Sequence, residues 1–342
     1  MRRIWTVISS ASVLVAMGLV VCLAPTSFVL RSPGTALDLL SPENPLIRVD
    51  GQTTATTGSV LATSMVQTAP TGVATLPGVI VNYLRGDRDA LPRDAVYPPG
   101  QTANDAASAH DQLVESSREQ AVVAGARQAG VDVVERVRIA SVWQKGQSYQ
   151  VLFPGDYVLE IDNTPMSTVN DVTDYIQNNK QVGDQVVVTV LRGETTQKFT
   201  IKLAGSSTNG TVPSLGIVCD MGYWYTPRVD IVMGVDQGDP AQGLALALAT
   251  YDLLTPSALP GDAVIAAVGQ ITADGIVSKV SAINEQATSA WDAHATTLLI
   301  PRDNCADVTG DFPGMAIVPV LTLDQAVAVL SSPATDGSLP HC

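Results

Sequence analysis

The sequence predicts a multidomain protein that combines α/β and α+β parts behind an N-terminal transmembrane helix. Three observations predict it: an uncharged apolar run near the start, a strand-rich segment over residues 131–205, and alternating strands and helices over residues 206–334. With 342 residues, the chain is long enough for two or three compact domains. Its 19 basic and 33 acidic residues give a net charge of −14, which argues against a nucleic-acid partner.

Residues 1–30 predict a short cytoplasmic stub followed by a membrane anchor. Arg2 and Arg3 precede a run without charge that lasts until Arg31, and about 20 such residues cross a bilayer. The arginines before the run predict a single-pass protein of the cell membrane, with a cytoplasmic N-terminus and an extracellular bulk. A cleaved signal peptide is the alternative, although no small-x-small cleavage site is evident and Val21 before Cys22 makes a poor lipobox.

Residues 31–130 predict short strands and loops that lead into a helix. The part from residue 51 to residue 82 is rich in Thr, Ala and Gly and carries short β-branched runs. Thr102 and Asp105 have the spacing of a capping box, and Gly130 can end a helix. We therefore expect a helix over residues 102–129.

Residues 131–205 predict a β-rich module with one helix. "VVERVRIASV" and "LFPGDYVLEIDNTPM" indicate strands, "TVNDVTDYIQNN" indicates a helix, and "QVVVTVLRGETTQKFTIKL" indicates a hairpin. This order resembles a PDZ domain. PDZ domains bind an extended peptide as an added strand beside a helix.

The resemblance implies a peptide-binding surface made of one strand and one helix face. On this prediction its residues are Val137 and Ile139 of the strand, with Val169, Val172 and Ile176 of the helix. Many PDZ domains also hold a C-terminal carboxylate in a glycine-containing loop before the binding strand, and "GVDVVER" has no clear loop of that type. A module that only packs against its neighbours therefore remains an alternative.

Residues 206–334 predict an α/β domain, and residues 335–342 predict a C-terminal tail. Of the cysteines outside the anchor, we favour a disulfide between Cys305 and Cys342, since it would tie down the tail. That pairing leaves Cys219 as a free thiol. No group of Cys and His residues has metal-ligand spacing, and we expect neither a metal nor a cofactor.

Taken together, the residues resemble the membrane-anchored PDZ–Lon-like proteases of Gram-positive bacteria over nearly the whole chain. The motifs are "RSPGTALDLL", "ALPRDAVYPPG", "ATTLLIPRDNC" and "TLDQAVAVL", in that order. The family has a Lon-type α/β proteolytic domain without an ATPase module, and nothing in this chain resembles a Walker loop. Lon-type domains commonly form rings, so the resemblance implies possible homo-oligomers.

In that family, a serine on a glycine–proline turn and a lysine on another helix form the catalytic dyad, because a serine hydroxyl needs a base that takes its proton. Carried over residue by residue, the serine position falls on Ala241 and the lysine position on Gln286. The turn itself maps onto Gly238, Asp239, Pro240 and Gly243. Both catalytic groups are missing, so we predict no catalytic residue here. A carboxylate at Asp239 would also repel an oxyanion at this helix start.

The residues near the expected dyad offer poor substitutes. Lys279 lies seven residues before Gln286, Ser278 and Ser281 do not lie on the turn at Ala241, and His294 is expected at the surface. The sequence therefore predicts a pseudoprotease that binds peptides, unfolded segments or envelope proteins, or that assembles with active relatives. The alternatives are an active ATP-independent serine endopeptidase with a displaced catalytic pair, and a structural envelope protein.

Overall fold

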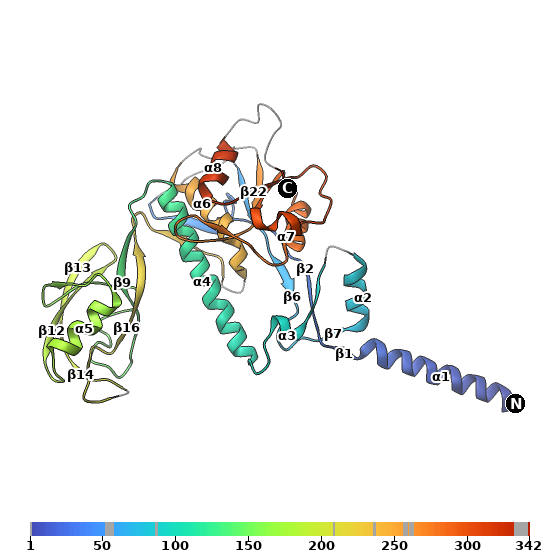
Figure 1. Ribbon diagram of the computed structural model, residues 1–342, viewed down its shortest axis with the longest axis horizontal. Coiled ribbons are helices and arrows are strands. Elements are labelled where there is room, and N and C mark those ends of the chain that lie inside the picture. The colour runs from blue at the N-terminus through green and yellow to red at the C-terminus, as the bar shows by residue number, and fades with distance from the viewer. Residues whose placement is uncertain are drawn as a thin grey trace. The chain divides into compact units, whose positions relative to one another are not determined.

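The computed structural model describes residues 2–51, 58–85, 88–207, 209–234, 237–255, 259, 263–331 and 341–342, with the backbone alone for residues 2–10. Most of the predicted tail, residues 335–342, lies outside this part. The chain forms two compact units (Figure 1). Unit 1 comprises Met1–Val131 and Pro227–Cys342, and unit 2 comprises Asp132–Thr226.

Unit 1 is built on a five-stranded sheet with the order β22-β21-β18-β5-β3. Strands β5, β18, β21 and β22 are parallel to their neighbours, whereas β3 joins β5 in antiparallel fashion. Apolar runs such as "TLLIP" form these strands because both faces of a parallel sheet are covered. The strands are β3 (Leu37–Asp38), β5 (Ser59–Ala62), β18 (Val264–Ala267), β21 (Thr297–Pro301) and β22 (Ala316–Val320).

Short strands complete unit 1. They pair as β1 with β7, β4 with β17, and β19 with β20, while β2 lies between β6 and β8. Segments from residues 31–130 thus share sheets with each other and with the later part of the chain. The bounds are β1 (Pro25–Thr26), β2 (Phe28–Pro33), β4 (Ile47–Val49), β6 (Met65–Gln67), β7 (Ala74–Thr75), β8 (Ala90–Pro92), β17 (Val229–Ile231), β19 (Gln270–Ile271) and β20 (Val277–Ser278).

The helices of unit 1 include a central buried one, α6. Its sequence "GLALALATYDLL" is apolar on all sides, as expected of a helix surrounded by protein. Helix α4 packs against α6, and a Cβ at Gly125 would collide with the Ala247 carbonyl and Thr250, so this close approach requires glycine. The predicted capping box of Thr102 and Asp105 starts α4. The helices are α1 (Arg2–Leu23), α2 (Leu76–Arg85), α3 (Arg93–Val96), α4 (Ala103–Gln128), α6 (Gly243–Leu254), α7 (Ile283–Asp292) and α8 (Leu323–Ser331), with the 3₁₀ turns η2 (Pro240–Gln242) and η3 (Arg302–Asp307).

Unit 2 is a β-sheet with the order β13-β12-β10-β9-β16, to which β11 adds beside β10. A single helix, α5, packs on it over a core of aliphatic side chains. Thr168 and Asp171 form a capping box at the start of α5. The elements are β9 (Val134–Val142), β10 (Tyr157–Ile161), β11 (Thr164–Pro165), α5 (Val169–Asn179), β12 (Gln185–Arg192), β13 (Thr195–Lys202), β14 (Ala204–Gly205), β15 (Pro213–Ser214) and β16 (Ile217–Trp224).

The N-terminal run does not form the predicted anchor. Helix α1 ends at Leu23, and the apolar run then continues as strands β1 and β2, which pair with other strands of unit 1. In the part of the chain that the structure describes, no helix is long and apolar enough to cross a membrane. The predicted transmembrane helix in residues 1–30, and the single-pass membrane location that depends on it, are therefore wrong.

Two further features concern cysteines and the surface. A disulfide joins Cys305 of η3 to Cys342, the pair that the sequence favoured.

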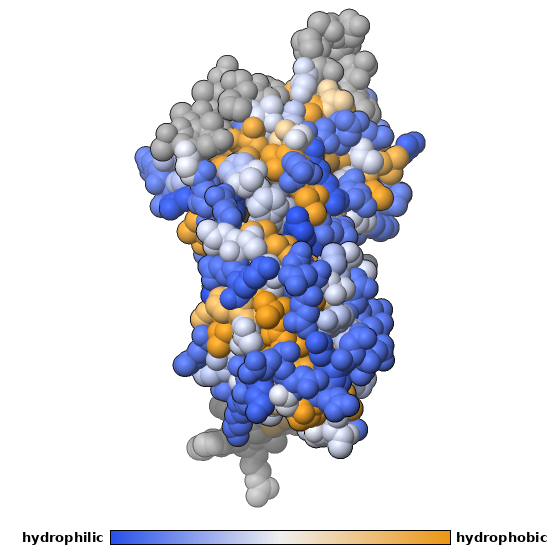
Figure 2. Space-filling view, turned by 90° about the vertical axis from the view of Figure 1, so that its left-hand side faces the viewer, coloured by the Kyte–Doolittle hydropathy of each residue, from blue (hydrophilic) through white to orange (hydrophobic). Residues whose placement is uncertain are grey.

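On the face shown in Figure 2, hydrophilic residues surround smaller patches of apolar ones. Such patches mark candidate binding surfaces only where they are hollowed and lined by a defined set of side chains.

Candidate functional site

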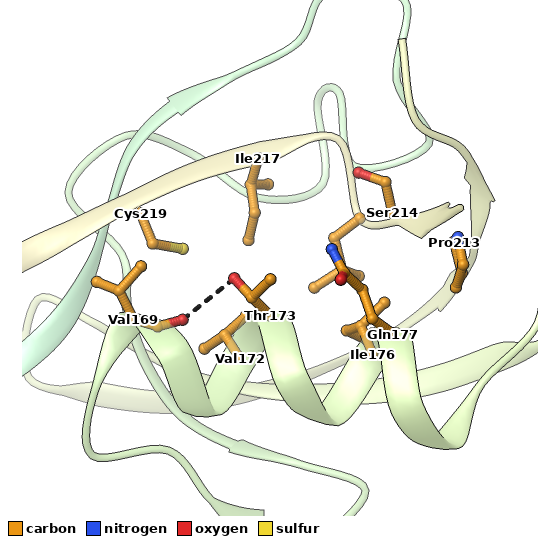
Figure 3. Close-up of a pocket in the computed structure, with 10 residues that line it drawn as sticks. Val169, Val172, Thr173, Ile176, Gln177, Pro213, Ser214, Ile217 and Cys219 are labelled. Carbon is orange, nitrogen blue, oxygen red and sulfur yellow. Dashed lines mark hydrogen bonds between the residues drawn. The ribbon is translucent and has the colours of Figure 1, made fainter. Parts of the chain in front are cut away.

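A groove runs between helix α5 and strand β16 in unit 2 (Figure 3). The helix contributes a row of side chains at intervals of three and four residues, and the strand contributes every second side chain. Its volume is about 110 Å³, and none of its lining residues is charged. The α5–β16 groove is lined by Val169, Val172, Thr173, Ile176, Gln177, Pro213, Ser214, Leu215, Ile217 and Cys219.

Strand β16 forms one end of the sheet, so one of its edges is open within the described part of unit 2. It pairs with β9 on its other side, from Ile217 opposite Val142 to Trp224 opposite Val134. The N–H of Trp143 donates to the Gly216 carbonyl at 2.8 Å, so this carbonyl points toward β9. Because a trans peptide group holds its C=O and N–H in opposite directions, the Ile217 N–H points away from β9. The open edge therefore presents a backbone donor beside α5.

The loop just before β16 presents one further donor, the Ser214 hydroxyl. Ser148 donates its hydroxyl proton to the Leu215 carbonyl at 2.6 Å, which turns that carbonyl away from the following N–H. That N–H belongs to Gly216 and donates to the Ser214 hydroxyl oxygen at 3.1 Å, which leaves the Ser214 proton available as a donor. Gly216 has a φ of +72°, a conformation that glycine adopts without strain. The Ser214 hydroxyl is therefore the donor that this loop offers at the groove.

Cys219 forms part of the wall of the groove and is chemically quiet. Burial raises the pKa of its thiol to about 11, and the charge of Asp220 acts in the same direction. The thiol is therefore protonated at neutral pH and is a poor nucleophile. It serves as a small apolar side chain that faces the helix, next to Val169 in Figure 3.

The structure brings some of the predicted peptide-binding residues together and separates others. Val169, Val172 and Ile176 line the groove. Val137 and Ile139 lie on β9, one strand in from the edge, and are fully buried in the core. The strand beside the helix is β16, which lies in the range 206–334 that the sequence analysis gave to the α/β domain. A signal was present in "PSLGIVCD", where a glycine loop precedes an alternating strand.

The predicted dyad positions lie in unit 1, in a buried setting that we name the 241–286 site. Ala241 is 5% exposed and Gln286 is 1% exposed. The Thr63 hydroxyl donates to Gln286 Oε1 at 2.9 Å, and the Thr63 carbonyl accepts from Gln242 Nε2 at 3.2 Å. Thr63 thus connects Gln286 with the residue that follows Ala241.

The 241–286 site lies at the carboxyl ends of two parallel strands. Thr63 directly follows β5, and Gly269 follows β18 and donates its N–H to the Ala241 carbonyl at 2.7 Å. Beyond β18, the sheet continues through β21 and β22 on one side, while β5 lies on the other. The described strands follow one another across this sheet in chain order, β3-β5-β18-β21-β22, so the strand order does not reverse beside this site.

The helix start at Ala241 has no free donor for an oxyanion. The Ala241 N–H donates to the Asp239 carboxylate at 2.9 Å, and the Gln242 N–H donates to the Asp239 carbonyl at 2.9 Å. Burial raises the pKa of Asp239, while the Ala241 N–H and the charges of His110 and Arg31 oppose that shift. The backbone donors of this turn are thus used within the fold, and the Ala241 side chain carries no nucleophilic atom.

The possible substitutes lie in other roles. Lys279 forms an exposed ion pair with Asp307 at 2.8 Å. Ser278, Ser281 and His294 are exposed at the surface. No described contact joins any of them to Ala241.

Comparison with known proteins finds two similarities. Residues 102–203 match the family model described as PDZ domain. The chain is 31% identical to a Lon protease of Chloroflexus aurantiacus over 128 residues, which cover 36% of this chain and 15% of that protein. It is 30% identical to Lon protease 2 of Herpetosiphon aurantiacus over 112 residues, which cover 31% of this chain and 13% of that protein. The chain therefore contains a PDZ domain and a partial similarity to Lon proteases that spans a small share of their length.

Solved structures of PDZ domains are also similar to a quarter of the chain. The PDZ domain of the SdrC-like protein Lin2157 from Listeria innocua is 28% identical, covers 25% of this chain and 92% of its own, and has a TM-score of 0.23. The corresponding domain of Lmo2051 from Listeria monocytogenes is 30% identical, covers 25% of this chain and 86% of its own, and also has a TM-score of 0.23. Because these TM-scores lie below 0.5, the likenesses carry no argument on fold or function.

Proposed function

We propose that this chain is a peptide-binding pseudoprotease of the PDZ–Lon-like kind. It binds a C-terminal peptide segment in the α5–β16 groove and does not cut it. The single observation that carries the binding proposal is the open edge of β16 beside an apolar helix face. Partners of this activity are unfolded or C-terminal protein segments, and an assembly with active relatives or with further copies would let the bound segment reach a protease.

The groove has the features that recognition by strand addition needs. A peptide strand would lie about 4.8 Å from β16, between the strand and α5. Its backbone would bond to the open edge, where the Ile217 N–H is available. Its carboxylate would lie at the loop that contains Ser214 and Gly216, and alternate side chains would face Val172 and Ile176. Because no lining residue is charged, apolar side chains fit these positions best.

The absence of proteolysis is proposed from the 241–286 site. A methyl group at Ala241 cannot attack a carbonyl, and the amide of Gln286 cannot accept a proton from a nucleophile. The Thr63 hydroxyl donates its proton to Gln286 Oε1. A donor held by an amide oxygen has no base to activate it.

Fluorescence anisotropy with the full chain tests the binding proposal. The probes are labelled peptides that end in an aliphatic residue with a free carboxylate, compared with the same peptides amidated at the C-terminus. We expect saturable binding that amidation weakens by about tenfold or more, since charge-assisted hydrogen bonds to the carboxylate are lost. Equal affinity for both forms, or no saturable binding, would overturn the proposal.

A matched pair of variants on α5 locates the binding. Thr173 is exposed and lines the groove, whereas Asn178 is exposed on the same helix and does not line it. Thr173→Trp fills the groove, and we expect it to weaken peptide binding by about tenfold or more. Asn178→Trp adds the same bulk elsewhere and should bind like the wild type. If both variants bind equally well, the peptide does not lie in this groove.

A further inference from the structure

A second cavity, unrelated to the α5–β16 groove, lies in unit 1 between η3, β22 and α8. Its volume is about 560 Å³, within the range of roughly 300–1,000 Å³ that small-molecule sites have. Pro319, Val320 and Val329 supply apolar walls. The cavity is lined by none of the residues of the 241–286 site.

Each of the polar side chains described around this cavity can donate a hydrogen bond to a ligand. Arg302 lines it and is exposed, and none of the lining residues that the structure describes is acidic. The His341 ring can donate from a nitrogen. Gln325 uses its Oε1 to accept from the Leu321 N–H at 2.9 Å, so its amide NH₂ is left to donate. A cavity with one guanidinium and two neutral donors over apolar walls matches a ligand with a single negative charge.

We propose that this cavity binds a small organic carboxylate with an aliphatic body. The carboxylate would pair with the Arg302 guanidinium in the two-pronged geometry that this planar group favours. The aliphatic body would cover Val320 and Val329. A phosphate dianion fits less well, because one guanidinium and no lysine line the cavity.

The disulfide holds one wall of this site. Cys305 lines the cavity, and its bond to Cys342 fixes the neighbouring His341 at the cavity edge. Without that bond, His341 belongs to a terminal segment with no covalent tie to η3. Binding at this site therefore depends on the oxidised state of the pair.

Titration calorimetry with the full oxidised chain tests the proposal, with sodium octanoate as the probe and 1-octanol as the uncharged comparison. We expect saturable octanoate binding, with 1-octanol at least about tenfold weaker. Arg302→Gln should weaken octanoate binding about tenfold or more, while Arg48→Gln, an exposed arginine on β4 outside the cavity, should leave it unchanged.

Two more variants keep the test independent of charge alone. Ala328→Trp fills the cavity at an exposed lining position and should abolish octanoate binding. Cys342→Ser, or reduction of the wild type, should weaken it. The proposal is overturned if octanoate does not bind at millimolar concentration, if 1-octanol binds as tightly, or if Ala328→Trp binds like the wild type. A negative result for octanoate does not bear on the proposal of peptide binding, since peptide anisotropy reports on the α5–β16 groove in unit 2.

Discussion

The α5–β16 groove and the 241–286 site differ in whether their backbone N–H groups are free or already hydrogen-bonded within the protein. In the groove, the Ile217 N–H points to the open edge of β16, where a ligand can use it. At the 241–286 site, the Ala241 N–H is taken by the Asp239 carboxylate, and the neighbouring side chains are buried. The first region therefore has a backbone donor for a ligand, whereas the donors of the second are used within the fold. This difference shows that a binding site is recognised by which backbone N–H groups are free to bond a ligand, and not only by the residue types of its motif.

The largest effect that we expect comes from the core around the 241–286 site. Leu246 on α6 is 1% exposed. Leu246→Ala should lower the free energy of unfolding of unit 1 by about 2–5 kcal/mol, through lost burial and the cavity that remains. Urea unfolding followed by circular dichroism measures it. Peptide affinity under native conditions should not change. A large loss of affinity with little loss of stability would contradict the account, because it would mean that the 241–286 site and not the α5–β16 groove binds the peptide.

A smaller effect tests whether Thr63 and Gln286 form a structural pair. Thr63→Val leaves the buried Gln286 oxygen without its donor and should cost about 1–3 kcal/mol of unfolding free energy. The double variant Thr63→Val/Gln286→Met removes both polar partners, and we expect it to regain most of that loss. A double-mutant cycle by urea unfolding gives the coupling. If the two losses simply add, the pair is not a unit and the site is more open than described.

A substitution in the loop before β16, with an equal or smaller effect on stability, tests where the peptide end lies in the groove. Gly216→Ala places a Cβ 3.3 Å from the Gly146 Cα, on a residue with a φ of +72°. Adopting that conformation costs a non-glycine residue about 1–2 kcal/mol. We expect a corresponding loss of stability in unit 2 and weaker binding of peptides with a free carboxylate. Should the free-carboxylate preference survive unchanged, the loop is not where the peptide end lies.

The smallest effect concerns pH and unit 1. Glu285 on α7 is buried, and this burial raises its pKa, with the charge of Asp89 acting in the same direction. Between the ordinary and the raised pKa, the folded chain binds more protons than the unfolded chain, so the free energy of unfolding falls as pH rises through this window. Glu285→Gln cannot ionise and should lose this part of the pH dependence, as urea unfolding at several pH values would measure. A pH profile identical to that of the wild type would contradict the assignment.

Sequence patterns predicted the helical wall of the groove but not its strand. The three-and-four spacing of Val169, Val172 and Ile176 is a local signal, and these residues line the groove. The strand partner β16 comes 38 residues after α5 ends at Asn179 and starts at Ile217, and pairing over such a distance leaves no periodicity to read. The strands of unit 1 raise the same difficulty, since β5 pairs with β18 across two hundred intervening residues.

The anchor prediction failed for a related reason. The absence of charge up to Arg31 is a property of composition, and it does not indicate where a helix ends. Pro25 and the β-branched residues that follow it enter strands that pair with β7, β6 and β8. The assignment of Ala241 to the serine position stays a prediction from the local pattern around Gly238 and Pro240. The contact of Thr63 with Gln286 could not be predicted, because Thr63 follows a strand that is distant in the sequence.

The account's central claim, that the chain binds peptides without cutting them, is tested most directly by proteolysis. The full chain is incubated with a fluorogenic unfolded protein, next to the variant Ala241→Ser/Gln286→Lys. The account predicts no cleavage by the wild type, while the same preparation binds carboxylate-ended peptides. Cleavage by the wild type that a serine-directed fluorophosphonate blocks would contradict it and would place a catalytic pair outside the 241–286 site.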